Sequence, residues 1–309
     1  MDERMNRPVV TVILATYNGE LFLPEQLESL ATQSRMPDRI VLRDDGSVDR
    51  SVEIVKVWAN QNGVALQQVN GPRLGPARSF LRALQAAQPA DIFLFCDQDD
   101  VWQPYKIERA LDHLPWGGGV APTLYATQLE VVDEQLNFLR LSSVPKCLSF
   151  GSAACESLLT GCTMAFNAGF RELLVRVLPE HAAMHDWWCY LLATSTIGSV
   201  LCFDSTPTVR YRQHSGNALG AGPIGWRALR ARGQRFFRRD SNMRSMQLQE
   251  FAKLYESDLA PNALRILSQL LDAKCGLGPR VRATFTAPIR RQTVLATLTT
   301  RVALLTNRF

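Results

Sequence analysis

Short apolar runs alternate along the first part of the chain with segments in which apolar residues recur every three or four positions. The runs are rich in β-branched residues, as in VVTVILA from Val9, which is typical of buried strands. The segment that opens at Pro24 has helical spacing, with proline where a helix start tolerates it. We predict strands at 9–15, 39–43, 65–69 and 91–96, alternating with helices at 24–33, 51–60, 77–87 and 104–114. This order predicts an α/β fold, with a mainly parallel sheet flanked by helices.

The pattern is less regular further along the chain. We predict strands at 123–132, 161–166, 200–203 and 208–212, and helices at 170–178 and 185–196. From residue 223 onward the sequence is helical in character and rich in arginine. We therefore predict an α/β domain over residues 1–223 and a helical, arginine-rich extension over residues 224–309.

The composition of the 309 residues, 46% hydrophobic and 20% charged, is that of a globular protein. We expect no membrane-spanning helix, because no apolar run reaches the required length, and no signal peptide, because MDERMNRP lacks an apolar core. The seven cysteines are an odd number without a CxxC pair. They favour buried free thiols in a reducing cytoplasm.

Charge is distributed unevenly along the chain. Residues 1–223 hold 18 Lys and Arg against 24 Asp and Glu, whereas residues 224–309 hold 16 against 5. Between residues 224 and 245, aromatic and apolar residues such as Trp226 and Phe236 are interleaved with seven arginines. This pattern predicts that the C-terminal extension, residues 224–309, contacts an anionic membrane surface. A solvated helix face and an oligomer contact are the alternatives, and nucleic acid is disfavoured because no nucleic-acid-binding motif accompanies the charge.

Polar and acidic clusters follow three of the predicted strands. They are Thr16-Tyr17-Asn18, Asp44-Asp45 and Asp97-Gln98-Asp99-Asp100. Ligands of open α/β sheets bind at the carboxyl ends of strands, and neighbouring carboxylates need a neutralising partner. A divalent cation that bridges phosphates is such a partner, so we predict a metal-diphosphate site rather than a solvated acidic loop. No GxGxxG and no GxxxxGK[ST] motif occurs, which disfavours dinucleotide-binding and P-loop sites.

Several strings, in order, resemble a known family. VILATYNGELFLPEQLESLATQS, RDDGSVDRSVEIV and FLFCDQDDVWQPYKIERAL resemble the inverting family 2 glycosyltransferases of the GT-A fold. LLTGCTMAFN and YRQHSGNALG resemble the subset often described as rhamnosyltransferases of bacterial surface polysaccharides. The resemblance covers about residues 8–220 and leaves out the basic extension.

The resemblance implies a donor site at the strand ends. One of Asp44 and Asp45 falls on the aspartate that hydrogen-bonds the nucleotide base, whose imide suits uracil or thymine. Arg73 and Arg78 are candidates for phosphate contacts, since guanidinium groups suit phosphate oxygens; solvated surface charge is the alternative. The expected donor-binding residues are Thr16, Tyr17, Asn18, Asp44, Asp45, Arg73, Arg78, Asp97, Gln98 and Gly161.

The DxD pair falls on Asp97 and Asp99 and implies a bound Mn²⁺ or Mg²⁺. In the family the first aspartate lies near the ribose and the metal, and the second is a direct ligand. His214 follows a predicted strand and precedes a glycine turn, so it is a candidate third ligand or diphosphate contact, with a structural role as the alternative.

The family's catalytic base falls on Asp186, with His185 where glutamate is frequent. A carboxylate at this position takes the proton of the acceptor hydroxyl. The alternative is an ordinary helix cap, which would lower the pKa of Asp186. Trp187 and Trp188 are candidates for stacking on an acceptor sugar, although core packing is the more common use of tryptophan.

The expected function is therefore sugar transfer from a UDP- or dTDP-sugar, with dTDP-rhamnose among the candidates. The acceptor is a glycan or lipid-linked hydroxyl in cell-surface polysaccharide or lipopolysaccharide assembly, and the location is cytoplasmic or peripheral on the inner face of the membrane. One alternative is a haloacid-dehalogenase-like phosphohydrolase, since residues 97–101 fit DxDx[TV], although three βα units precede them. The other is a non-catalytic nucleotide-sugar-binding module, against which the presence of Asp97, Asp99 and Asp186 together argues.

Overall fold

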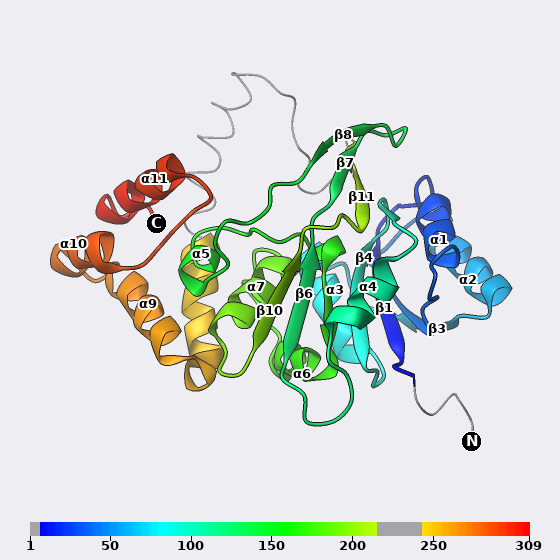
Figure 1. Cartoon of the computed structure of the whole chain (residues 1–309), viewed down its shortest axis with the longest axis horizontal. Coiled ribbons are helices and arrows are strands. Elements are labelled where there is room, and N and C mark those ends of the chain that lie inside the picture. The colour runs from blue at the N-terminus through cyan, green and yellow to red at the C-terminus, as the bar shows by residue number, and fades with distance from the viewer. Residues whose placement is uncertain (1–6, 215–242) are drawn as a thin grey trace.

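The computed structural model describes residues 7–214 and 243–309 and is built around a seven-stranded sheet (Figure 1). The strand order is β10-β6-β9-β4-β1-β2-β3, and all neighbours are parallel except β9, which is antiparallel to β4 and β6. The expected mainly parallel sheet is confirmed. The strands are β1 (Val10–Thr16), β2 (Arg39–Asp44), β3 (Ala65–Val69), β4 (Ile92–Asp97), β6 (Thr123–Thr127), β9 (Ala165–Asn167) and β10 (Val200–Asp204).

Helices cover both faces of the sheet, and alternate residues of each strand bury against one layer or the other. In β1, Val12 and Leu14 join the core under α1 (Leu23–Ala31), α2 (Ser51–Asn62) and α4 (Lys106–His113). Ile13 joins the opposite core, which lies under α3 (Pro76–Ala86), α6 (Ala168–Arg176) and α7 (His185–Ser195). Because these strands are buried on both sides, they are continuous apolar runs in the sequence.

A second, four-stranded sheet lies across the carboxyl end of the first in the order β5-β11-β7-β8. It consists of β5 (Val101–Trp102), β7 (Glu130–Val132), β8 (Phe138–Leu141) and β11 (Val209–Arg212). The single strand predicted at 123–132 is wrong, because the chain leaves the first sheet after β6 and enters the second at β7. The strand predicted at 161–166 is wrong in its first half, where a 3₁₀ turn, Gly161–Thr163, precedes β9.

The described part of the C-terminal extension is helical, as predicted. Residues 243–255 are helical and are followed by α9 (Pro261–Asp272), α10 (Leu277–Thr286) and α11 (Val294–Leu305), at the end of the molecule opposite α1 and α2 (Figure 1). Phe251 and Tyr255 are fully buried and pack edge-on against Trp188 of α7. A short helix, α5 (Phe150–Ala153), also contacts α7 and α9. Residues 243–309 therefore share one hydrophobic core with the α/β part.

The interleaved arginine and aromatic segment that predicted a membrane contact, including Trp226 and Phe236, lies almost entirely outside the described residues. In the described part of the chain, no helix is long and apolar enough to cross a bilayer. All seven cysteines are free thiols; four of them are buried, as expected, whereas Cys147 and Cys202 are partly buried and Cys275 is exposed.

Candidate active site

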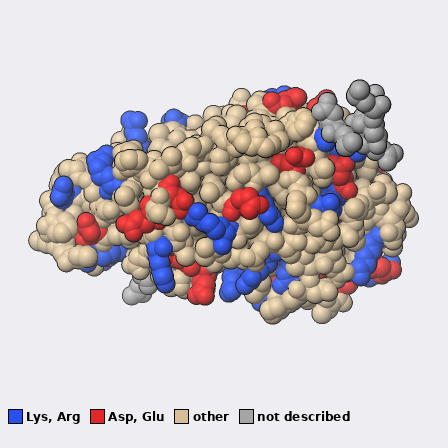
Figure 2. All heavy atoms as spheres, turned by 90° about the horizontal axis from the view of Figure 1, so that it is seen from below, with Lys and Arg blue, Asp and Glu red and all other residues tan. Residues whose placement is uncertain are grey.

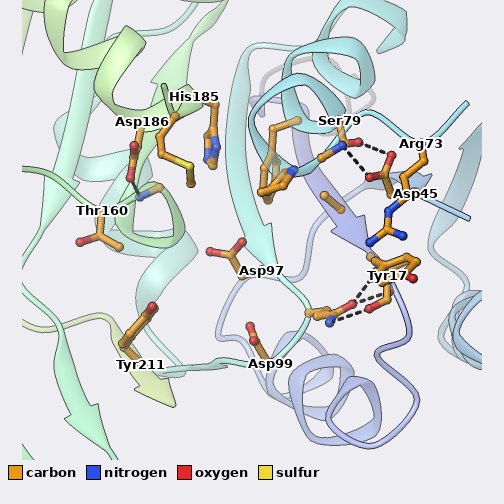
Figure 3. A pocket seen from close by; sticks show the side chains of 18 residues that line it. Tyr17, Asp45, Arg73, Ser79, Asp97, Asp99, Thr160, His185, Asp186 and Tyr211 are labelled. Atoms are coloured by element: carbon orange, nitrogen blue, oxygen red, sulfur yellow. Dashed lines mark hydrogen bonds between the residues drawn. The ribbon is translucent and has the colours of Figure 1, made fainter. Parts of the chain in front are cut away.

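The carboxyl ends of β1, β2 and β4 meet at one edge of the large sheet. The parallel register places Thr16 beside Asp44 and Ala15 beside Asp97. A cavity of about 430 Å³ opens there. In Figure 3, Asp97 and Asp99 stand between Asp186 on one side and Tyr17 on the other. Of the expected site residues, the cavity is lined by Thr16, Tyr17, Asp45, Arg73, Asp97, Gln98, Asp99, Gly161 and Asp186.

The side chain of Gln98 joins the loop after β1 to the loop after β4. Its carbonyl oxygen accepts hydrogen bonds from the Thr16 hydroxyl at 2.7 Å and from the Tyr17 backbone N–H at 2.8 Å, and its amide donates to the Tyr17 carbonyl at 3.2 Å. Gly19 lies against the same amide, and a Cβ there would stand 2.4 Å from the carbonyl oxygen of Gln98. The first loop and the DxD loop are therefore held as one unit.

The two aspartates after β2 have different places. Asp45 lines the cavity, and its carboxylate accepts backbone N–H groups of Leu74 and Gly75, both at 2.7 Å, and the Ser79 hydroxyl at 2.8 Å. Burial alone raises the pKa of Asp45, but these bonds and the charge of Arg43 outweigh it and hold the pKa below its usual value. Asp44 instead accepts the backbone N–H groups of Gly46 and Ser47 in its own turn and is not among the described lining residues.

Of the two arginines expected to meet phosphate, Arg73 lines the cavity. Its guanidinium carbon stands 3.9 Å from the centre of the Tyr17 ring, a cation–π contact that bridges the first loop and the start of α3. Arg78 is exposed and lies outside the described lining. Asn18 is also outside the described lining, and its side-chain oxygen Oδ1 accepts a hydrogen bond from the Val48 backbone N–H at 2.9 Å.

Asp97 and Asp99 form an acidic pair inside the cavity. Burial, and then the charges of Asp99 and Asp186, raise the pKa of Asp97 to about 8. No hydrogen bond to the Asp97 carboxylate is recorded among residues 7–214 and 243–309. Asp99 accepts a hydrogen bond from, or donates one to, His214 Nε2 at 2.8 Å. A crowded, partner-poor carboxylate beside a second carboxylate and an imidazole is a donor set that fits a divalent cation.

A second acidic group lies beneath this pair. Ligand atoms of Asp97, Asp100 and Cys162 lie within 4.8 Å of one another. Asp100 is fully buried, and burial followed by the charges of Asp99 and Asp97 raises its pKa well above the usual value. Burial lowers the pKa of the nearby Lys106 to about 8. Asp100 and Cys162 are not among the described lining residues, so of this group only Asp97 faces the cavity.

Asp186 lies in the first turn of α7 and faces the cavity, but it is not the capping residue, which is Met184. One oxygen accepts the Gly161 N–H at 3.1 Å and the other the Trp187 N–H at 2.6 Å. Burial outweighs these bonds and raises the pKa of Asp186 to about 6. The alternative prediction, that Asp186 caps the helix and has a lowered pKa, is wrong. The buried surroundings disfavour the ionised carboxylate more than the two N–H groups favour it.

His185 is 2% exposed and packs between two phenylalanines, with ring centroids 4.1 Å from Phe80 and 4.8 Å from Phe95. Within the described ranges neither ring nitrogen has a hydrogen-bond partner, and burial lowers the pKa of His185 to about 3. A Cβ on Gly161 would stand 2.4 Å from Nε2, so glycine is needed for this close approach. The imidazole is neutral and serves as part of the cavity wall.

The two tryptophans expected to stack on an acceptor sugar make contacts within the protein instead. Trp188 is fully buried against Phe251 and Tyr255, so it belongs to the core and presents no face to an acceptor. Trp187 is half-buried, and its indole N–H donates to the Ala153 carbonyl at 2.6 Å.

Several cavity residues were not predicted as site residues. They are Ala15, Gly75, Pro76, Ser79, Phe80, Thr160, Met184, His185 and Tyr211. Thr160 and Tyr211 come from LLTGCTM and YRQH, strings that resemble the family, so the motif positions were a usable signal. The apolar wall formed by Phe80 and Met184 carries no signal that distinguishes it from core.

Comparison with known proteins identifies relatives of this chain. The model of glycosyl transferase family 2 matches residues 11–177, which span β1 to α6. The dTDP-rhamnosyl transferase RfbG of Shigella flexneri is 26% identical over 224 residues, 67% of this chain and 74% of the relative. An uncharacterised glycosyltransferase of Nostoc sp. is 25% identical over 221 residues, 67% of this chain and 66% of the relative.

Two solved structures show the same fold. One is Staphylococcus aureus TarS 1–349 in complex with UDP-GlcNAc, with a TM-score of 0.53, 15% identity, and coverage of 97% of this chain and 92% of that one. The other is the mannosyltransferase PcManGT of Pyrobaculum calidifontis in complex with GDP-Man and Mn²⁺, with a TM-score of 0.52, 22% identity, and coverage of 97% and 75%.

The sheet, the strand-end cavity and these matches define an enzyme of the glycosyltransferase class with the GT-A fold. The chain belongs to glycosyl transferase family 2. Neither the phosphohydrolase nor the non-catalytic binding module is favoured by these findings.

Proposed function

We propose that the enzyme transfers a sugar, with inversion, from a nucleoside diphosphate donor to a hydroxyl group of a glycan or lipid-linked acceptor in cell-surface polysaccharide or lipopolysaccharide assembly. The observation that carries the proposal is the arrangement of three acids in one cavity. Asp97 and Asp99 lie at the end of β4, and Asp186, with a pKa of about 6, lies at the start of α7. Asp97 and Asp99 are proposed to hold the cation that stabilises the leaving diphosphate. Asp186 is proposed to accept the proton of the incoming hydroxyl.

The donor is a pyrimidine nucleotide sugar, UDP- or dTDP-linked, with dTDP-rhamnose as the first choice. The named activity of RfbG and the UDP-GlcNAc complex of TarS support this choice. Tyr17, stacked beneath Arg73, provides an aromatic face at the cavity edge, and Asp45 fixes the loop at 74–75 that borders it. Arg73 is the proposed phosphate contact, because it lines the cavity and Arg78 is not among the described lining residues.

Asp97 and Asp99, with His214 behind Asp99, are the proposed ligands of Mn²⁺ or Mg²⁺. The cation supplies a positive charge that stabilises the departing diphosphate. A bound cation would reduce the repulsion between the two carboxylates. Asp97 would therefore be ionised when it holds the cation. His214 Nε2, 2.8 Å from Asp99, orients that carboxylate or joins the ligand set.

Asp186 is the proposed general base. The acceptor hydroxyl attacks the anomeric carbon, the bond from that carbon to the diphosphate oxygen breaks, and the hydroxyl proton passes to the Asp186 carboxylate. A pKa of about 6 keeps the group ionised at neutral pH while leaving it basic enough to take a proton. Gly161 holds the carboxylate by one N–H at 3.1 Å, which fixes its direction.

The proposal is tested by offering the purified enzyme dTDP-rhamnose, UDP-GlcNAc and GDP-mannose with Mn²⁺. We expect thermal stabilisation by a pyrimidine donor and a product whose anomeric configuration is opposite to that of the donor, measured by NMR. Stabilisation by the purine donor alone would refute the donor class, and retained configuration would refute the mechanism.

Removal of divalent metal is a second test. With EDTA in excess we expect transfer to stop and Mn²⁺ to restore it, since nothing else described in the cavity neutralises both carboxylates. Asp99→Asn should raise the dissociation constant for Mn²⁺ by about tenfold or more, measured by calorimetry. Full transfer in EDTA would remove the metal from the mechanism.

A further inference from the structure

Helix α10 exposes an apolar face. Leu277, Val281 and Phe285 are all exposed, and they follow one another at intervals of four residues, so they share one side of the helix. The Phe285 side chain is 75% exposed. The buried residues of the helix are Ala283 and Thr284. A single exposed apolar residue is ordinary, whereas an aligned row of three indicates a surface that binds another molecule or a membrane.

Helix α11 repeats the arrangement. Leu295, Leu298 and Val302 lie along its exposed side, with Val294 beside them at 78% exposure. Thr300, Ala303 and Leu304 form the buried side. The Arg301 guanidinium donates to the Thr284 carbonyl, which holds α11 against α10. The two helices therefore form one unit, here called the C-terminal helix pair, residues 277–305, with an exposed apolar row on each member.

The charged residues in the last stretch of the chain are all basic. Residues 273–309 contain seven Lys and Arg and no Asp or Glu. Arg291 is paired with Glu156, but Arg282, Arg290 and Arg308 are exposed and have no ion pair recorded within residues 7–214 and 243–309. Figure 2 shows this end of the molecule from below, with Lys and Arg and some Asp and Glu side chains among uncharged residues. Arg282 flanks the apolar row of α10 on its own helix.

We propose that the C-terminal helix pair docks the enzyme on an anionic lipid surface. The apolar rows enter the boundary between headgroups and acyl chains, and the arginines meet the phosphates above it. The pair lies on the surface and does not cross it, because no described helix is long and apolar enough to do so. A lipid surface fits better than a second copy of the chain, since a two-fold contact would bring two groups of seven basic residues together.

The inference is independent of the donor and the reaction, because it rests on residues at the opposite end of the chain from the cavity. It narrows the membrane contact expected of the extension, residues 224–309, to two described helices, apart from the segment at 224–245, most of which lies outside the described residues. The test therefore keeps that segment intact in every variant.

The full-length chain is sedimented with vesicles of 30% phosphatidylglycerol in phosphatidylcholine and with vesicles of phosphatidylcholine alone. We expect binding to the anionic vesicles that weakens as salt rises. The double change Phe285→Gln and Leu298→Gln should lower affinity by about tenfold or more. Arg282→Gln with Arg308→Gln should lower it by about tenfold or more on anionic vesicles.

The matched control is Val57→Gln on α2, where the side chain is 47% exposed, close to the 53% of Leu298. It should bind vesicles like the parent chain. All variants are exposed-surface changes, so equal unfolding temperatures confirm that the fold is kept. Equal binding by parent and helix-pair variants overturns the proposal. So does a helix-pair variant that turns a dimeric parent into a monomer in ultracentrifugation without changing vesicle binding.

Discussion

At the residue scale, the environment of Asp186 decides its chemistry. Its two backbone N–H bonds would favour ionisation, but burial prevails and the pKa rises to about 6. For Asp186→Asn we expect turnover to fall by about 10²–10⁴ while the donor dissociation constant stays the same, because Asn keeps the shape and loses the basicity. Steady-state kinetics and calorimetry with the donor check this. Loss of donor affinity with normal turnover would contradict the assignment.

The same residue predicts a pH dependence. Below pH 6 the carboxylate becomes protonated, so kcat/KM of the parent enzyme should fall about tenfold per pH unit. The measurement is a pH–rate profile at low donor concentration. A profile that stays flat from pH 7 to pH 5 would show that another group takes the proton.

His185 predicts a second pH effect, on stability. Its pKa is about 3 in the fold, below the ordinary histidine value of 6.5, so the unfolded chain takes up a proton that the folded chain does not. The contribution of the neutral His185 to the free energy of unfolding is therefore fully present above pH 6.5, and it decreases as the pH falls below 6.5. Between pH 7 and pH 5 the parent should lose about 2 kcal/mol relative to His185→Gln, measured by denaturant unfolding. Parallel pH profiles of the two proteins would contradict this.

At the scale of elements, Asp45 ties β2 to the start of α3. The carboxylate receives the N–H groups that would otherwise be unpaired before the helix, at Leu74 and Gly75, and Gly75 adopts a positive φ of 78° there. Asp45→Asn replaces one acceptor oxygen by a donor, so we expect a loss of about 2 kcal/mol in the free energy of unfolding.

The matched control for this prediction is Asp133→Asn. Asp133 also accepts two backbone N–H groups and one side-chain amide, but it lies in an exposed turn. We expect a smaller loss there, because water replaces the missing bonds. Equal midpoints for both variants in urea would show that burial of Asp45 adds nothing.

At the scale of the whole molecule, the C-terminal helices complete the core. Leu248, Phe251 and Tyr255 are buried against the α/β part, and Trp188 has two of them as neighbours. A chain ending at residue 223 should therefore fail to fold cooperatively, since its core would be open along α7. Near-ultraviolet circular dichroism and thermal unfolding check this. A sharp unfolding transition of the shortened chain would show that residues 1–223 are an independent domain.

The parallel α/β fold could be predicted because its strands are buried on both faces and thus appear as unbroken apolar runs. Every strand and helix predicted before residue 115 is found within about two residues of its expected place. The failure at 123–132 has a physical reason. The alternation of Thr123 to Val132 describes two strands equally well as one, and only the pairing of β6 with β10 and of β7 with β11 divides them.

By itself, the sequence determined the type of sheet, the acids at the strand ends and the basic character of the last third, because these depend on residue type and spacing along the chain. Tertiary structure alone decided that Asp45 and not Asp44 faces the cavity, that Trp188 is buried, and that Asp186 has a raised pKa. Each of these depends on which distant residues surround the group, and burial and hydrogen bonding are set by neighbours in space.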